Sequence, residues 1–154
     1  MSSSLASPTQ LDFEQIKQII PQRFPFLMLD RVVEIEPGER VVGLKNLTGN
    51  ELFYQGHFPK KAVTPGAMIS EAIAQTGIIF FHFWQPEQRD VTYLMGSLKM
   101  RFIEPVWPGD QMRIEVTPIK LTSTAGILNA KVTVDERIVA KGEFGLVAKD
   151  NSAL

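Results

Sequence analysis

One stretch limits the possible folds of this chain more than any other, residues 64–84, which read TPGAMISEAIAQTGIIFFHFW. Thr64 and Pro65 form a typical helix start, because a capping hydroxyl precedes a proline at the first helical position. The helix that follows is predicted to run to Trp84, before Pro86, and it is apolar on nearly all sides. Such a helix must be enclosed by other elements, since a helix on a protein surface keeps one polar face.

The segments around this helix have the pattern of strands. Two strands joined by a turn at Pro37–Gly38 are predicted before it, after a short helix over residues 13–20 with Asp12 as its N-cap. Four more strand-like segments follow the helix: VTYLMGSLKMRFI, QMRIEVTPIKLT, GILNAKVTVDE and RIVAKGEFGLVA. We therefore predict an α+β fold, in which a curved antiparallel sheet wraps around one long central helix.

Length and charge exclude several classes of function. A chain of 154 residues is expected to form one domain, which we place at residues 11–150. The net charge of −1 gives no bulk attraction to nucleic acid or to an anionic membrane. Without cysteine the chain has no thiolate nucleophile, disulfide or cysteine-based zinc site, which fits a reducing cytoplasm.

Two segments bear on targeting and on membrane insertion. Residues 1–10 are rich in serine and lack the basic start and apolar run of a signal peptide, so we expect a flexible tail there. The apolar helix contains Glu71, Gln75 and His82, which argues against a membrane span.

The central helix carries a carboxylate among apolar neighbours. Ala67, Glu71 and Gln75 are spaced by four residues, so they share one narrow stripe of small and polar side chains. Burial among apolar residues disfavours the charged form of a carboxyl group, and a protonated Glu71 is suited to act as a general acid.

Two further groups near the helix start, Gly66 and His57, are suited to act together with Glu71. Gly66 lies in the first turn, where its N–H has no partner inside the helix and can face a developing negative charge. His57 lies in the preceding loop and can act as a base near neutral pH. A reaction that removes a proton next to a carbonyl and protonates a leaving hydroxyl needs a base, an acid and an oxyanion donor of this kind. Spacing alone leaves an alternative open, in which Glu71 faces the surface and the loop histidine is satisfied by hydrogen bonds to the backbone.

A resemblance to a known family favours the catalytic interpretation. The segment PQRFPFLMLDRVVEIEPGERVVGLKNLTGNELFYQGHFPKKAVTPGAMISEAIAQTG closely resembles the β-hydroxyacyl-acyl carrier protein dehydratases of FabZ type. FIEPVWPGDQMRIEV looks like a later signature of the same family, and the likeness spans residues 11–148. The resemblance implies the hotdog fold and dehydration of (3R)-hydroxyacyl thioesters to trans-2-enoyl thioesters in fatty-acid biosynthesis, without a metal or redox cofactor.

The same resemblance implies roles for individual residues. His57 matches the family's catalytic histidine, Glu71 its catalytic glutamate, and Gly66 the helix-start glycine that polarises the thioester carbonyl. Gln75 is expected to orient Glu71 or a water molecule. The substrate is expected on the phosphopantetheine of acyl carrier protein, and active sites are expected at a homodimer interface, with a trimer of dimers as a possible larger assembly.

The family pattern around the histidine is HFPGxPxMPG, and this chain departs from it at three positions. It has Lys60 in place of the glycine, Ala62 in place of the proline and Thr64 in place of the methionine. Gln22 stands where a histidine is common, and Trp107 is bulkier than the usual valine. These changes leave the acid, base and oxyanion positions intact, but they leave the substrate undetermined.

Two further groups of residues are candidates for binding. A set of aromatic residues is expected to line an acyl tunnel, or else to belong to the plain core: Phe53, Tyr54, Phe58, Phe80 and Tyr93. A set of basic residues is expected to dock an acidic carrier protein, or else to form a solvated surface: Lys60, Lys61, Lys99 and Arg101. His82 lies among aromatic neighbours and is assigned to packing, and two histidines in separate elements predict no metal site.

The sequence leaves two alternative functions open. A hotdog thioesterase would use a carboxylate to activate water on a thioester, although His57 and Gly66 fit elimination better. A non-catalytic acyl-binding or assembly paralogue would have kept the fold while the loop from Lys60 to Thr64 changed.

Overall fold

The computed structural model describes residues 7–88 and 90–154. Residues 1–6 of the predicted tail therefore lie outside the described residues, and residues 7–10 are exposed. The helices and strands follow in this order: α1 (Phe13–Lys17), β1 (Arg31–Glu36), β2 (Arg40–Asn46), η2 (Leu52–Gln55), α2 (Gly66–Trp84), β3 (Val91–Phe102), β4 (Gln111–Leu121), β5 (Ala125–Val134), β6 (Arg137–Asp150) and η3 (Asn151–Ala153).

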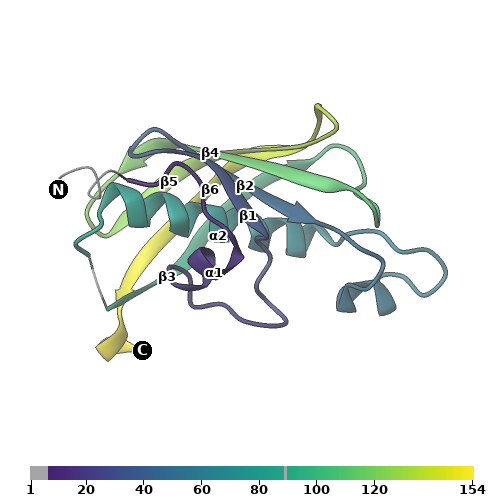
Figure 1. Ribbon diagram of the computed structural model, residues 1–154, viewed down its shortest axis with the longest axis horizontal. Coiled ribbons are helices and arrows are strands. Elements are labelled where there is room, and N and C mark those ends of the chain that lie inside the picture. The colour runs from purple at the N-terminus through teal and green to yellow at the C-terminus, as the bar shows by residue number, and fades with distance from the viewer. Residues whose placement is uncertain (1–6, 89) are drawn as a thin grey trace.

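The strands form one six-stranded sheet in the order β1-β2-β4-β5-β6-β3, and each neighbouring pair is antiparallel. The ladder is interrupted in β1, β3 and β4, between Val32 and Glu34, between Met95 and Ser97, and between Pro118 and Lys120. Such irregularities increase the bend and twist of a sheet. The sheet curves around α2, which lies along its concave side (Figure 1). The predicted α+β architecture is confirmed.

The core lies between α2 and the sheet. Nearly every residue of α2 from Ile69 to Phe81 is buried, so the helix is enclosed on most of its sides. Gly77 allows a close approach, because a β-carbon there would lie 2.7 Å from the ring of Phe144 on β6. In residues 7–88 and 90–154, no helix has both the length and the apolar character needed to cross a membrane.

The predicted N-cap of the central helix at Thr64 is wrong. The helix begins at Gly66, and its N-cap is Pro65, which has extended backbone angles and makes no side-chain capping bond. The Thr64 hydroxyl forms a buried hydrogen bond of 2.7 Å with the hydroxyl of Tyr54 instead. Because a long-range partner occupies this hydroxyl, it is not used to cap the helix.

The first helix is shorter than predicted, although its cap is confirmed. Asp12 and Gln15 form a reciprocal capping box at the start of α1. The helix ends at Lys17, and beyond this end the Arg23 guanidinium donates to the carbonyl oxygens of Lys17 and Ile20, at 2.7 and 2.9 Å.

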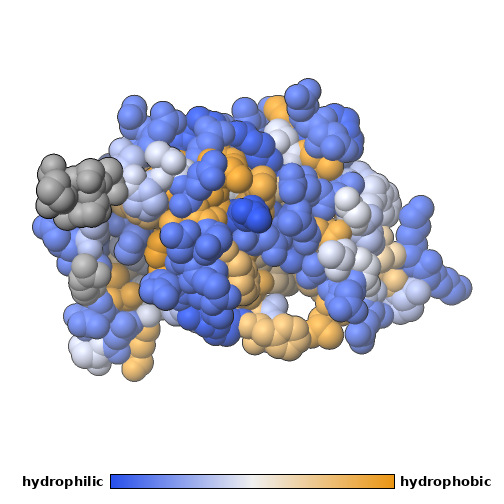
Figure 2. Space-filling view, viewed as in Figure 1, coloured by the Kyte–Doolittle hydropathy of each residue, from blue (hydrophilic) through white to orange (hydrophobic). Residues whose placement is uncertain are grey.

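Two apolar regions of the surface remain uncovered in the single chain. Strand β3 forms an edge of the sheet and exposes Leu94, Met95 and Leu98. The loop between α1 and β1 exposes Phe24 and Phe26, and Figure 2 shows hydrophobic surface where this loop projects at the lower edge of the molecule. Both regions are suited to contact with another chain.

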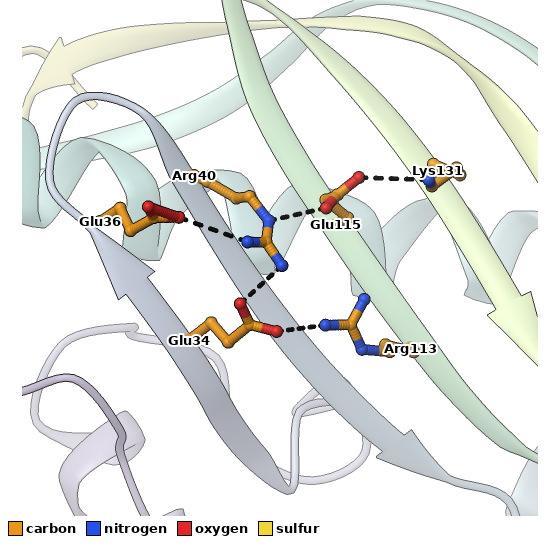
Figure 3. A network of polar contacts seen from close by, with 6 residues as sticks. All are labelled: Glu34, Glu36, Arg40, Arg113, Glu115 and Lys131. Carbon is orange, nitrogen blue, oxygen red and sulfur yellow. Dashed lines mark hydrogen bonds and ion pairs between the residues drawn. The ribbon is translucent and has the colours of Figure 1, made fainter. Parts of the chain in front are cut away.

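A network of charges crosses the sheet opposite the helix (Figure 3). Arg40 on β2 lies at its centre and forms ion pairs with Glu34 at 2.6 Å, Glu36 at 3.3 Å and Glu115 at 2.7 Å. Glu115 also pairs with Lys131, and Glu34 with Arg113, so the network joins β1, β2, β4 and β5. Burial alone would raise the pKa of Glu115, but the hydrogen bond from Arg40 and the charges of Lys131 and Arg40 outweigh it and lower that pKa.

We expect Glu115→Gln to lower the free energy of unfolding by about 1 kcal/mol at pH 7, because Arg40 and Lys131 lose a charged acceptor. The pKa of Glu115 is lower in the folded chain, so its contribution is present above the unfolded pKa and is lost as the pH falls through the folded pKa. The difference between variant and parent should therefore shrink towards zero in acid. Urea unfolding at pH 7 and pH 3 measures it, and an equal difference at both values would contradict the assignment.

Candidate active site

Three segments bring the predicted catalytic residues to one end of the fold. The connection between β2 and α2 carries His57, the first turns of α2 carry Gly66 and Glu71, and the loop between α1 and β1 contacts Gln75. Figure 1 shows that the connection, which includes η2, extends beyond the end of the sheet. The site therefore lies where the enclosure of α2 ends.

His57 is half-buried and held at both its backbone and its ring. Its N–H donates to the carbonyl of Phe53, and its carbonyl accepts from the N–H of Val63, each at 3.0 Å. Ring atom Nδ1 lies 2.8 Å from the carbonyl oxygen of Val63. A carbonyl only accepts hydrogen bonds, so Nδ1 carries a proton, and in the neutral form of the ring the free lone pair lies on Nε2. In that form the ring accepts a proton at Nε2.

Gly66 opens the central helix. No side chain caps this end, and the Gly66 N–H donates to no other group in the described part of the chain. The ring of Phe102 packs against Gly66, and a β-carbon at residue 66 would lie 3.3 Å from it. An unpartnered N–H at a helix N-terminus is suited to an oxygen that gains negative charge.

Gln75 holds Glu71 in place. The Gln75 side chain is fully buried, and its Nε2 donates to Glu71 Oε2 at 2.9 Å and to the carbonyl oxygen of Phe26 at 2.6 Å. Its Oε1 accepts from the N–H of Met28 at 2.9 Å. One amide thus joins the carboxylate to the loop between α1 and β1. Glu71 itself is only partly buried, less than its apolar neighbours in the sequence suggest.

The single chain does not join the two candidate proton-transfer groups. In residues 7–88 and 90–154, no hydrogen bond or ion pair links His57 to Glu71. Gly66 and Glu71 lie on the same helix, about one and a half turns apart. The structure places the three residues in neighbouring segments without forming one complete constellation within the chain.

The five aromatic residues predicted to line a tunnel lie in different surroundings. Tyr54 and Phe58 line a cleft of about 290 Å³, and Tyr93 lines another, of about 250 Å³, beside His82. Phe80 is fully buried in the core, and Phe53 packs against that core. Tyr93 stacks on Phe81 with ring centroids 5.0 Å apart, and its hydroxyl donates to Gln88. The structure therefore does not gather these residues around one cavity.

The four basic residues predicted to dock a partner are exposed, and they fall into two groups. Lys60 and Lys61 line the cleft beside Tyr54 and Phe58. Lys99 and Arg101 line a separate cleft on β3, where Lys131 and Lys141 add further positive charge.

The departures from the family pattern can be located around the site. Lys61 Nζ lies 5.0 Å from the centre of the Trp107 ring, so the bulky indole forms a cation–π contact with this loop. Thr64 bonds to Tyr54, as described above. The Oε1 atom of Gln22 is buried and has no hydrogen-bond partner among the described residues.

Sequence reasoning missed the backbone partners of the site. The carbonyl of Val63 fixes the proton on His57, and the backbone of Phe26 and Met28 holds Gln75. Backbone groups occur at every position, so no residue type marks these roles. The contact between Tyr54 and Thr64 was also missed, because each residue was assigned separately to another role.

Metal binding was tested against the side chains present. Among residues 7–88 and 90–154, no group of three or more His, Cys, Asp or Glu residues has an arrangement that could hold a metal ion. The described part of the chain thus offers proton-transfer groups and backbone donors.

Comparisons with known proteins agree with this fold. Residues 20–143 match the sequence model of the FabA-like domain. A curated relative, the 3-hydroxyacyl-[acyl-carrier-protein] dehydratase FabZ of Staphylococcus saprophyticus, is 45% identical over 92% of this chain and 99% of the relative. The chain belongs to the FabA-like family, and the 3-hydroxyacyl-[acyl-carrier-protein] dehydratases named FabZ are its relatives within it.

Solved structures share the fold at much lower identity. The dehydratase heterocomplex ApeI:P from Xenorhabdus doucetiae aligns with a TM-score of 0.71 at 13% identity, over 89% of this chain and 92% of that one. A hypothetical thioesterase from Streptococcus pneumoniae, solved with coenzyme A, aligns with a TM-score of 0.58 at 14% identity, over 77% and 84%. The hotdog fold predicted from the sequence is confirmed.

Replacing Gln75 tests its role in holding the loop between α1 and β1. Gln75→Glu keeps an acceptor for the Met28 N–H but cannot donate to Glu71 or to the Phe26 carbonyl. We expect the free energy of unfolding to fall by about 2 kcal/mol, because buried acceptors lose their donor and two carboxyl groups are brought together. Urea unfolding at pH 7 measures this change, and a variant as stable as the parent would show that the bonds to Gln75 contribute little.

Proposed function

We propose that this chain dehydrates (3R)-3-hydroxyacyl thioesters carried on acyl carrier protein, giving trans-2-enoyl thioesters in the biosynthesis of fatty acids or related acyl chains. The observation that carries the proposal is the hydrogen bond between His57 Nδ1 and the Val63 carbonyl, which in the neutral form of the ring leaves Nε2 to act as a base. The names of the FabZ relatives support the same reaction.

In the proposed mechanism His57 Nε2 removes the proton from C2 of the substrate, next to the thioester carbonyl. The electron pair moves towards the carbonyl oxygen, where the Gly66 N–H stabilises the negative charge. The uncapped start of α2 supports this role, because the helix dipole adds to the attraction.

Glu71 completes the elimination by giving a proton to the C3 hydroxyl, which leaves as water while the double bond forms between C2 and C3. The carboxyl group must enter this step protonated. Gln75 holds one of its oxygens from the protein side, which leaves the other available to the substrate. The proton taken by His57 and the proton given by Glu71 balance over the reaction.

We further propose that the active unit is a homodimer in which His57 of one chain acts with Glu71 of the other. Two features of the single chain support this arrangement: among the described residues no hydrogen bond or ion pair joins His57 to Glu71, and the edge strand β3 exposes apolar side chains. Pairing of two β3 edges would extend the sheet and cover those side chains. A trimer of such dimers is the larger assembly within this proposal.

The remaining parts of the proposal concern the partner and the setting. Acyl carrier protein would deliver the substrate on its phosphopantetheine arm, and Lys60 and Lys61, with Lys99 and Arg101, would steer its acidic surface. The reaction uses no metal or redox cofactor and takes place in the cytoplasm. Residues 11–150 act as the single dehydratase domain, with residues 1–10 as a tail outside it.

Substitution of the two proton-transfer groups tests the chemistry. We expect His57→Ala and Glu71→Gln each to lower kcat for hydroxyacyl carrier thioesters by about 10² to 10⁴, because general acid–base catalysis contributes that much. Mass spectrometry follows the loss of water across several chain lengths. Release of a free thiol in place of water would support a thioesterase, and a bound acyl chain that stays unchanged would support a non-catalytic acyl-binding protein.

Mixing the two inactive variants tests whether the site is shared. In a random mixture about half of the dimers contain one chain of each variant, and each of these holds one complete site if His57 and Glu71 come from different chains. We expect about a quarter of the parent activity to return after the variants are unfolded and refolded together. If both residues of a site came from one chain, every site would remain defective and the mixture would stay inactive.

A further inference from the structure

The side chains of Tyr54 and Thr64 form a buried polar contact. The two hydroxyl groups lie 2.7 Å apart, and each residue is only 6% exposed. Burial raises the pKa of Tyr54, so the phenol is neutral near pH 7 and either hydroxyl can donate. A bond of this kind cannot be exchanged readily for a bond to water, and losing one partner leaves the other hydroxyl unsatisfied.

The contact joins the two backbone segments that carry the proposed base and the proposed oxyanion donor. Tyr54 belongs to η2, three residues before His57, and Thr64 lies two residues before Gly66 at the start of α2. The hydrogen bond therefore closes the loop that contains His57 across its base, over ten residues of sequence.

Other bonds connect this contact to His57 and to the segment before β4. On one side the Phe53 carbonyl, next to Tyr54, accepts the His57 N–H at 3.0 Å. On the other side the Thr64 N–H donates to the Val106 carbonyl at 2.9 Å, which ties Thr64 to the segment before β4. Within the loop, Val63 is bonded to both the backbone and the ring of His57. A change in the separation of Tyr54 and Thr64 is thus passed to the His57 ring.

We infer that the hydrogen bond between Tyr54 and Thr64, which we call the hydroxyl clamp, sets the position of the His57 ring relative to the Gly66 N–H, so that Tyr54 and Thr64 are positioning residues for the dehydration. The inference rests on the proposed function. The hydroxyl at residue 64 is one of the departures from the family pattern, and it does not cap the helix, so the clamp gives that departure a role.

Positioning has a kinetic signature that differs from substrate binding. A displacement of about 1 Å at a reacting group can lower a rate by about 10²-fold. The clamp touches neither Nε2 of His57 nor the Gly66 N–H, so its loss should change their geometry without removing a group that binds substrate. The expected effect is a fall in kcat with little change in KM.

The test uses full-length variants that remove one hydroxyl at a time. Tyr54→Phe and Thr64→Val should each lower kcat by about 10- to 100-fold, with KM within about twofold of the parent. Thr64→Ser keeps the hydroxyl and should retain most of kcat. Thr76→Val is the matched control, because it removes another buried threonine hydroxyl, bonded to the Ala72 carbonyl at 2.9 Å, and should keep the parent kcat.

The double variant Tyr54→Phe, Thr64→Val separates positioning from stability. With both hydroxyl groups removed, no buried polar group is left unsatisfied, so Tm should recover towards the parent value. We expect kcat to stay low, because the clamp is still absent. If kcat recovers together with Tm, or if the single variants keep the parent kcat, the positioning role is overturned.

A spectroscopic measurement tests the clamp independently of turnover. The chain has two histidines, so nitrogen NMR of histidine-labelled protein gives two ring systems, and His57→Ala assigns them. The parent should show His57 with the proton on Nδ1, and Tyr54→Phe should weaken this preference while Thr64→Ser preserves it. An unchanged His57 spectrum in Tyr54→Phe and Thr64→Val would overturn the inference. If the parent itself does not dehydrate any hydroxyacyl carrier thioester, the proposed function fails, and this spectrum alone decides the clamp.

Discussion

Burial of α2 is the constraint on which the rest of the structure depends. A helix with almost no polar face has to be enclosed, and the irregular positions in β1, β3 and β4 let a single sheet curve around it. Enclosure also determines what the polar side chains of the helix can do. Ser70 and Thr76 donate to carbonyls one turn earlier on the helix, and Gln75 is fully bonded to neighbouring segments.

The candidate site lies where this enclosure ends. Among the described residues, the N–H of Gly66 in the first turn of α2 has no hydrogen-bond partner, and the connection that carries His57 leads into this turn. The groups that would handle protons are each held by a neutral partner, His57 by the Val63 carbonyl and Glu71 by the Gln75 amide. Neutral partners fix the orientation of both side chains without adding a charge to the site.

Much of the fold could be predicted from the sequence, because its elements carry local signals. The Asp12 cap, the turn at Pro37–Gly38 and the apolar helix were all found from residue type and spacing. The features that could not be predicted depend on tertiary contacts. Thr64 looked like a cap because its neighbours are those of a helix start, yet a tyrosine ten residues earlier binds its hydroxyl. The bonds from Gln75 to the backbone near Phe26 cross more than forty residues of sequence, and backbone groups have no signature by residue type. The roles of His57, Glu71 and Gly66 stay predictions.

The exposed edge strand β3 has a consequence for how the protein reaches its working state. In the single chain, β3 offers unpaired backbone groups beside Leu94, Met95 and Leu98, and such an edge is a template for pairing with the wrong strand. In the proposed dimer, assembly would compete with misassembly at the same surface. The yield of folded protein would then depend on how quickly two newly made chains meet, and expression level and temperature would affect that yield even where the sequence is unchanged.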